Sequence, residues 1–390
     1  MRQLRYRRCL FALVAALIAI VAILTSGCGG AAETATSASA SVSAASSTTT
    51  SASGSATASP SAALSVTSKL LVVRKQGASW RLVRLTPTTG ATEVLGTLPF
   101  RPWRALSSPH RSRVLYVSER KLAVVEVASG IVRRISVDGG VHGVDGATWI
   151  SDDEFIFGGG KYSGWPEGSS LYKADATSGA VSPFRGLKGG EPSYAPGDGS
   201  LVFVTSRVLA KAPEPYVASS GPWRSETIWR LSSLEAKRPK ALTGGLEYID
   251  AGRIYNEPLL SPDGRYILSP QTGTDVSITY SLLQVDLFGM AFLESSGESP
   301  TAAAWGGDKV AFQQSPVGTK TRGPAVFVYD VHRGSLAQYP CVGFMQLDWS
   351  PDGDLVGGAW QHHGKVFASA ASDLGAWVDL GPGLVPVWIR

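Results

Sequence analysis

A repeat of about 44 residues constrains the fold of this chain more than any other feature of its sequence. A short turn recurs after apolar stretches, at Ser108-Pro109, Ser151-Asp152, Ala195-Pro196, Ser261-Pro262-Asp263-Gly264, Gly306-Gly307-Asp308 and Ser350-Pro351-Asp352-Gly353. Successive turns are 43, 44, 66, 45 and 44 residues apart. A second turn keeps the same period and is marked by Gly90, Gly130, Gly179, Gly289, Gly334 and Gly375. A period of this length indicates an array of similar supersecondary units.

The stretches between these turns have the pattern of short β-strands. No segment after residue 68 keeps a 3.6-residue apolar period over three helical turns, which predicts an all-β fold. In Ser-Pro-Asp-Gly, Pro sets φ at the first corner, Asp caps the turn and Gly takes the left-handed position. Because of this motif, residues 69–390 resemble the TolB-like β-propellers, which share their architecture with WD-repeat propellers. The resemblance implies four-stranded blades and the binding of a partner by one face.

The number of repeats predicts a seven-bladed ring. Six repeats have an inner strand of their own, ending near Ser107, Ile150, Tyr194, Leu260, Trp305 and Trp349. The first repeat begins at Leu70 without such a strand, whereas the C-terminal stretch 385–389 looks like an inner strand without a blade. We therefore expect the C-terminal strand to pair with the first repeat and close the ring, because closure removes exposed sheet edges.

Residues 1–27 have the features of a lipoprotein signal peptide. Four arginines precede an unbroken apolar run, Cys9 to Leu24, which is short for a membrane span. The end of the run, Leu24-Thr25-Ser26-Gly27-Cys28, resembles the lipobox, although Thr25 stands where Leu is preferred. This resemblance implies cleavage before Cys28 and lipidation of its thiol; the alternative is an uncleaved N-terminal anchor. Both place the remaining chain on the extracytoplasmic side of the cell membrane.

Residues 28–67 are predicted to form the lipidated cysteine and a disordered tether, and residues 68–390 the propeller. The tether is almost wholly Ala, Ser, Thr and Gly, which cannot bury enough apolar surface to fold. Without the four arginines of the signal peptide, 32 of the 36 basic residues face 31 acidic ones, so no nucleic-acid partner is expected. Cys341 is then the one remaining thiol, which predicts a core residue and no internal disulfide.

The sequence contains no recognised catalytic motif, so we expect a protein that is not an enzyme and holds no cofactor or metal. The G-x-S-x-G elbow, the G-x-x-x-x-G-K-[ST] loop and the H-E-x-x-H helix are all missing. The five histidines are scattered, and the adjacent pair His362-His363 would point in opposite directions on an extended chain. The alternative is an enzyme resembling metal-dependent polysaccharide lyases of propeller fold, in which three or more histidines would converge on one ion.

Two sets of residues are candidates for binding. Long loops between the second and third strands are expected at 158–169 and 207–225, on the face that also carries the blade linkers. Their aromatic and basic residues, with one tyrosine of the next linker, are Lys161, Tyr162, Trp165, Tyr216, Trp223, Arg224 and Tyr248. Such residues dominate binding hot spots. The alternative is that the two tryptophans fold back onto their own blades.

The second set lies four residues before each turn and is expected to line the central channel. Its polar members are Arg104, Glu191, Glu257 and Gln346, and its apolar members are Ala147 and Ala302. The alternative role of this ring is to line a water-filled funnel without a ligand. Together these features predict a monomeric, membrane-anchored lipoprotein that acts as a binding or scaffolding propeller for an envelope protein or a cell-wall glycan.

Overall fold

The computed structural model describes Leu64 and residues 68–390, apart from 138–140, 142, 161–167, 210–222, 244, 248–257, 273–277, 286–288, 298–301, 315–323 and 360–363. All described residues belong to one compact unit, Ala58–Arg390. Within the described part of the chain, no helix has the length and apolar character needed to cross a membrane.

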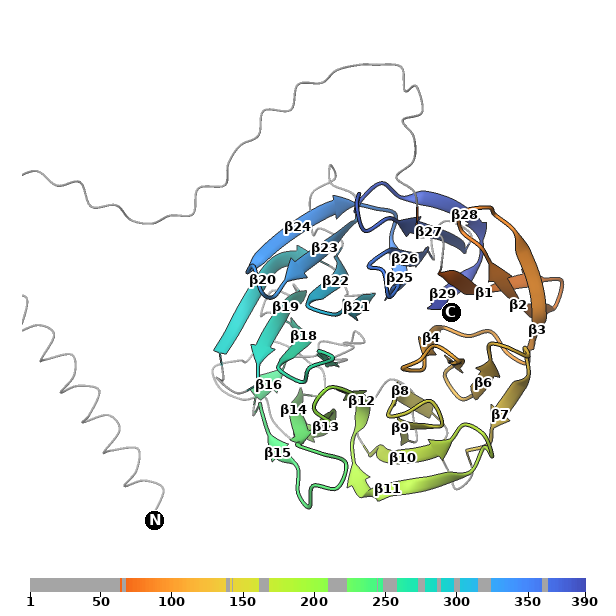
Figure 1. Ribbon diagram of the computed structural model, residues 1–390. Coiled ribbons are helices and arrows are strands. Elements are labelled where there is room, and N and C mark those ends of the chain that lie inside the picture. Colours follow the sequence, from red (N-terminus) through yellow and green to blue (C-terminus); the bar gives the residue numbers. More distant parts are fainter. Residues whose placement is uncertain are drawn as a thin grey trace, which may run out of the picture. The chain divides into compact units, whose positions relative to one another are not determined.

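Seven antiparallel sheets form the blades of a ring (Figure 1). In blades 2 to 7 the chain runs from the innermost strand outward. Blade 2 contains β4 (Arg104–Ser107), β5 (Arg113–Val117), β6 (Leu122–Glu126) and β7 (Val132–Ile135); blade 3 contains β8 (Gly143–Trp149), β9 (Glu154–Gly160), β10 (Ser170–Asp175) and β11 (Val181–Lys188). Blade 4 contains β12 (Gly190–Tyr194), β13 (Leu201–Leu209), β14 (Trp223–Leu231), β15 (Lys240–Ala241) and β16 (Gly245–Glu247).

Blades 5 to 7 repeat the same order of four strands. Blade 5 contains β17 (Leu259–Leu260), β18 (Tyr266–Thr272), β19 (Ile278–Gln284) and β20 (Gly289–Gly297); blade 6 contains β21 (Ala303–Gly306), β22 (Lys309–Gln314), β23 (Ala325–Asp330) and β24 (Ser335–Pro340). Blade 7 contains β25 (Phe344–Trp349), β26 (Leu355–Ala359), β27 (Lys365–Ser369) and β28 (Val378–Pro382). The six inner strands end where the sequence predicted them.

Blade 1 combines the two ends of the propeller. Its strand order is β29 (Leu384–Ile389), β1 (Lys69–Gln76), β2 (Ser79–Leu85) and β3 (Thr92–Leu98). The C-terminal strand pairs antiparallel with the first strand, Leu70 opposite Trp388 and Leu71 opposite Val387. It also contacts β25 of blade 7 and β4 of blade 2. The predicted closure of the ring is therefore confirmed.

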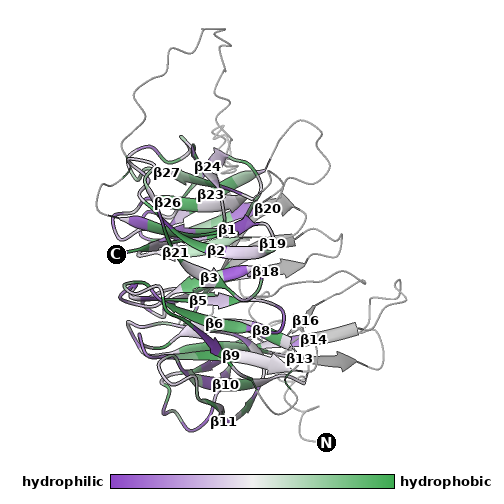
Figure 2. Cartoon of the chain, turned by 90° about the vertical axis from the view of Figure 1, so that its right-hand side faces the viewer, coloured by the Kyte–Doolittle hydropathy of each residue, from purple (hydrophilic) through white to green (hydrophobic). Residues whose placement is uncertain are grey.

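The core is divided into seven clusters of buried apolar side chains, one between each pair of adjacent blades. The cluster between blades 7 and 1 includes the fully buried Trp388, and the cluster between blades 1 and 2 includes Val387 and Tyr116. Figure 2 shows that hydrophobic residues are concentrated in the strands and hydrophilic ones in many of the turns. Each blade buries both of its faces against its neighbours, so the ring is held together by packing.

Three inner-strand tryptophans also link neighbouring blades by hydrogen bonds. The indole Nε1 of Trp149 donates to Leu106 O at 2.9 Å, and that of Trp305 donates to Leu259 O at 2.9 Å. Trp349 donates in the same way to Ala304 O at 3.1 Å. The bond satisfies the polar end of a side chain whose rings are packed in the core. The repeat therefore preserves an inter-blade contact as well as a turn.

The Ser-Pro-Asp-Gly turns have the geometry that the motif predicts. In the first complete copy, Gly264 has φ of 73°, and Asp263 Oδ1 accepts hydrogen bonds from Ser261 Oγ at 2.6 Å and from Arg265 N at 3.1 Å. In the second, Gly353 has φ of 87°. These turns join the first and second strands of blades 5 and 7.

Two predicted loops are shorter than expected because their ends continue the strands. Residues 158–160 belong to β9, where Gly158 lies against blade 4: a Cβ there would come within 2.7 Å of Gly190 Cα. Residues 207–209 and 223–225 pair with each other in β13 and β14. The outer edge of β14 pairs with both β15 and β16, which gives blade 4 a fifth strand. The linker after β15 therefore adds sheet structure that its sequence did not indicate.

Candidate functional site

The two faces of the ring carry different connections. Because strands alternate in direction, the loops between second and third strands share a face with the linkers that lead into each inner strand. We call this the long-loop face; it carries residues 161–169 and 210–222, which connect β9 to β10 and β13 to β14. The opposite, short-turn face carries the Ser-Pro-Asp-Gly turns. The long loops themselves lie almost wholly outside the described residues.

The inner strands carry a β-bulge near their long-loop end. The register shifts in β8, β12, β25 and β29. Gly146, Glu191 and Val385 have φ of 73°, 51° and 42° at equivalent positions in three of these strands. A positive φ is costly for a β-branched residue such as Val385. Bulges redirect side chains and are frequent beside binding sites.

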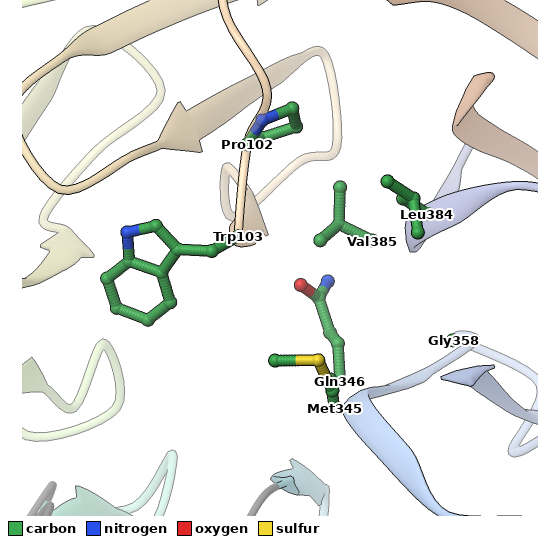
Figure 3. A pocket seen from close by; sticks show the side chains of 7 residues that line it. All are labelled: Pro102, Trp103, Met345, Gln346, Gly358, Leu384 and Val385. Atoms are coloured by element: carbon green, nitrogen blue, oxygen red, sulfur yellow. The ribbon is translucent and has the colours of Figure 1, made fainter. Parts of the chain in front are cut away.

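A small apolar hollow, of about 310 Å³ including open solvent, lies where the inner strands of blades 7 and 1 meet the linker into blade 2 (Figure 3). It is lined by Pro102, Trp103, Met345, Gln346, Gly358, Leu384 and Val385. Met345 is 37% exposed, whereas Val385 is buried. Gly358 stands near the end of the second strand β26, and the other lining residues stand before or near the start of an inner strand, so the hollow belongs to the long-loop face. Its lining contains no charged residue.

Gln346 forms the polar floor of this hollow and links three blades. Its Oε1 accepts a hydrogen bond from Ala105 N at 2.9 Å, and its Nε2 donates to Ala105 O at 2.9 Å and to Pro386 O at 3.1 Å. The side chain is buried. Both amide hydrogens are therefore used within the protein. Gln346 had been predicted to line the central channel as part of a polar ring, and the structure adds this role in blade packing.

The other channel residues have different surroundings. Arg104 is half-buried at the start of β4, and Glu191 is buried at the bulge of β12. A Cβ on Gly146 would lie 2.9 Å from Glu191 Cα, so blades 3 and 4 are in close backbone contact here. Ala147 is buried in β8 and Ala302 precedes β21. Glu257 lies outside the described residues, so the charged ring stays a prediction.

Most of the predicted loop-face residues are not described by the structure. Lys161, Tyr162, Trp165, Tyr216 and Tyr248 lie outside the described residues, as does Cys28. Trp223 and Arg224 had been predicted in a loop, but they open β14, opposite Leu209 and Val208. Pairing between these two segments extends the hairpin beyond what the composition of either one indicated.

Sequence reasoning missed the three side chains that give the hollow its apolar surface. Trp103, Met345 and Leu384 each stand one position before a residue at the register of the channel ring: Arg104, Gln346 and Val385. The register was therefore available in the sequence. What the sequence did not show was the bulges of β25 and β29, where both neighbouring residues, Met345 with Gln346 and Leu384 with Val385, line the hollow.

A second hollow, of about 970 Å³ including open solvent, lies between blades 6 and 7 on the short-turn face. Its charged lining residues are Asp308, Lys309, Asp330, His332, Arg333 and Asp352. His332 Nε2 lies 3.1 Å from Asp308 Oδ2. Arg333 Nε lies 3.8 Å from Asp330 Oδ2. Hydrogen bonds from the backbone N–H groups of Arg333 and His332 lower the pKa of Asp330.

The histidines and the cysteine that were considered as metal ligands or catalytic groups do not lie together within the described part of the chain. His110 lies in the turn after β4 and His332 in the turn after β23, while the other three histidines lie outside the described residues. Among the residues described, no three His, Cys, Asp or Glu side chains gather closely enough to hold a metal ion. Cys341 is half-buried, and burial raises the pKa of its thiol to about 12.

No family model and no curated protein sequence matches this chain. Among solved structures it is similar to TolB from Acinetobacter baumannii, with 13% identity, 82% of each chain covered and a TM-score of 0.47. A putative TolB from Agrobacterium tumefaciens has 17% identity and a TM-score of 0.47, over 73% of this chain and 95% of that one. A chain of a mitotic checkpoint complex has 14% identity and a TM-score of 0.44, over 73% and 81%. The strand pairing itself shows that the chain is a seven-bladed β-propeller.

Proposed function

We propose that this protein is a lipid-anchored, extracytoplasmic propeller without catalytic activity that binds another protein of the cell envelope through its long-loop face. The observation that carries the proposal is the apolar hollow of blades 7, 1 and 2. It places the half-buried Trp103 and Leu384 and the exposed Met345 around one opening. A partly exposed cluster of aromatic, thioether and aliphatic groups at the edge of a rigid scaffold is typical of a protein-binding surface.

The chemistry of the hollow favours a protein over a cell-wall glycan. A glycan needs hydrogen-bonding partners for its hydroxyl groups, and the one amide in the lining, that of Gln346, already uses both N–H groups on Ala105 O and Pro386 O. An apolar side chain of a partner needs no such groups, and its burial is favourable by about 25 cal/mol per Å². The predicted binding residues Trp165 and Trp223 stay part of this proposal, although their side chains lie outside what the structure describes.

The binding face is tested by crosslinking in native membranes followed by mass spectrometry. Met345→Glu places a charge in the hollow, whereas Leu336→Glu places the same charge on β24, the outer strand of blade 6; both side chains are exposed in the native protein. We expect a partner that is crosslinked by wild type and by Leu336→Glu and lost with Met345→Glu. The same partner recovered equally with all three proteins would refute binding at this face. A Trp165→Ala/Trp223→Ala variant tests the loop residues separately.

The membrane anchor is tested independently of the partner. A Cys28→Ser variant lacks the thiol that the lipobox-like sequence offers for lipidation. We expect wild type, but not the variant, to incorporate an alkyne analogue of palmitate. The mass of the mature wild-type protein should be that of a lipidated chain that begins at residue 28. Equal labelling of the two proteins would rule out Cys28 as the lipidation site. A mature protein that still contains residues 1–27 would support the uncleaved anchor instead.

A further inference from the structure

Arg111 occupies a backbone position at which four of the five other turns between a first and a second strand have glycine. It stands in the turn between β4 and β5 and has φ of 59°. At or near the same place in other blades, Gly199, Gly264, Gly307 and Gly353 have φ of 75°, 73°, 60° and 87°. A left-handed backbone is unfavourable for a residue with a Cβ, so an arginine here requires compensation elsewhere.

The guanidinium of Arg111 provides that compensation by reaching over blade 1 to blade 7. Its Nη1 lies 2.9 Å from Trp388 O of β29 and 3.3 Å from Asp348 Oδ2 of β25, and its Nη2 donates to Trp349 O. Asp348 Oδ2 in turn accepts a hydrogen bond from Trp388 N at 2.8 Å. The arginine and aspartate side chains are 17% and 20% exposed, so this ion pair is largely shielded from solvent. Arg111 of blade 2 and Asp348 of blade 7 are therefore both hydrogen-bonded to Trp388 of the closing strand.

Gln346 makes a second contact between blade 7, blade 2 and the closing strand, nearer the start of β29. It joins β25 to Ala105 of β4 and to Pro386 of β29. Gln346 and Asp348 are two residues apart on β25, so their side chains lie on the same face of that strand. The closing strand is thus held at two points by blades 7 and 2, in addition to its pairing with β1 in blade 1.

We propose that Arg111, Gln346 and Asp348 form a latch that holds β29 in the ring without the help of β1. Pairing within blade 1 and closure of the ring are then separate events: β1 can separate from β29 while β29 stays bound to blades 7 and 2. The amides of β29 report the two events individually. Trp388 N–H is bonded to Asp348 of the latch, whereas Val387 stands opposite Leu71 of β1.

The latch is tested by native-state hydrogen exchange on the whole protein. Arg111→Gly introduces the residue that four other turns use, so it relieves the strain of the positive φ while it removes the guanidinium together with the rest of the side chain. Gln346→Glu keeps the size of the side chain and the acceptor for Ala105 N but removes both N–H donors. Gln313→Glu is the matched control, because Gln313 Oε1 accepts from Phe344 N and so joins blade 6 to blade 7, whereas Gln346 joins blade 7 to blades 1 and 2.

We expect Arg111→Gly and Gln346→Glu to accelerate exchange of Trp388 N–H about tenfold or more, the factor expected for loss of a charged or buried hydrogen bond. Exchange at Val387 should rise less, and Gln313→Glu should leave both amides within about twofold of wild type. Unchanged exchange at Trp388 in the two latch variants would overturn the proposal. So would equal acceleration of Trp388 and Val387, because blade 1 would then open as one unit. If Arg111→Gly fails to fold, Gln346→Glu and Asp348→Asn carry the same test.

Discussion

Deletion of residues 384–390 removes the strand that closes the ring, and its cost follows from the burial of that strand. Val385, Val387, Trp388 and Ile389 are between 0% and 6% exposed and pack into the clusters on both sides of blade 1. Full burial of an apolar side chain contributes about 1.5–3 kcal/mol, so the four together contribute about 6–12 kcal/mol. A compact unfolded state lowers such values by roughly 10–40%. The contribution of the four side chains that remains after this reduction is still comparable with the free energy of unfolding of a typical domain, about 5–15 kcal/mol.

The assay is thermal unfolding followed by circular dichroism, with size-exclusion chromatography for aggregation. We expect the truncated protein to show no cooperative transition near that of wild type and to aggregate, because β1 becomes an exposed edge strand. Removal of the exposed Arg390 alone is the control and should leave the midpoint unchanged. A truncated monomer that melts within about 2 °C of wild type, a shift that corresponds to only about 1–1.5 kcal/mol in a domain of this size, would refute closure by β29 as a major source of stability.

Three further changes test individual contacts. Gly158→Ala would place a Cβ 2.5 Å from Asp145 O and 2.7 Å from Gly190 Cα, so urea unfolding should show a loss of about 1–3 kcal/mol; Gly343→Ala, with its nearest neighbour at 3.8 Å, should be nearly neutral. Trp349→Phe leaves Ala304 O without its indole donor and should cost about 1–3 kcal/mol, whereas an unchanged midpoint would show that the bond is dispensable. Because burial raises the pKa of Cys341 to about 12, its reaction with a thiol reagent at pH 8 should be about a thousandfold slower than that of an exposed cysteine, and rapid labelling of the native protein would contradict this.

The ring, the blade boundaries and the closing strand could be predicted because their signals are local and repeated. Pro, Asp and Gly recur at turns where only a few residue types fit. Residues 385–389 had the pattern of an inner strand without a blade of its own. The predicted loops 158–169 and 207–225 were too long, because pairing such as that of Val208 with Arg224 depends on the partner strand as well as on composition.

The contacts between blades could not be predicted in the same way. Gln346 bonds to Ala105, which is 241 residues away, and Arg111 bonds to Trp388, which is 277 residues away. No local pattern relates such positions. One signal was nevertheless present, since Arg111 stands where the repeat favours Gly. A residue that breaks a local rule in a regular repeat indicates an interaction outside that repeat.

The hollow and the latch share one residue, and this links binding to closure. Gln346 lines the hollow on the long-loop face, while its amide holds β29 to blades 7 and 2. A partner seated on Trp103, Met345 and Leu384 would contact both the closing strand and the blades that hold it, so it would bind the closed ring in preference to an opened one. A ligand with such a preference stabilises the form that it binds, by about 2.7 kcal/mol at a concentration one hundred times its Kd. On this reasoning the partner strengthens the closure of the ring at the place where the two ends of the propeller meet.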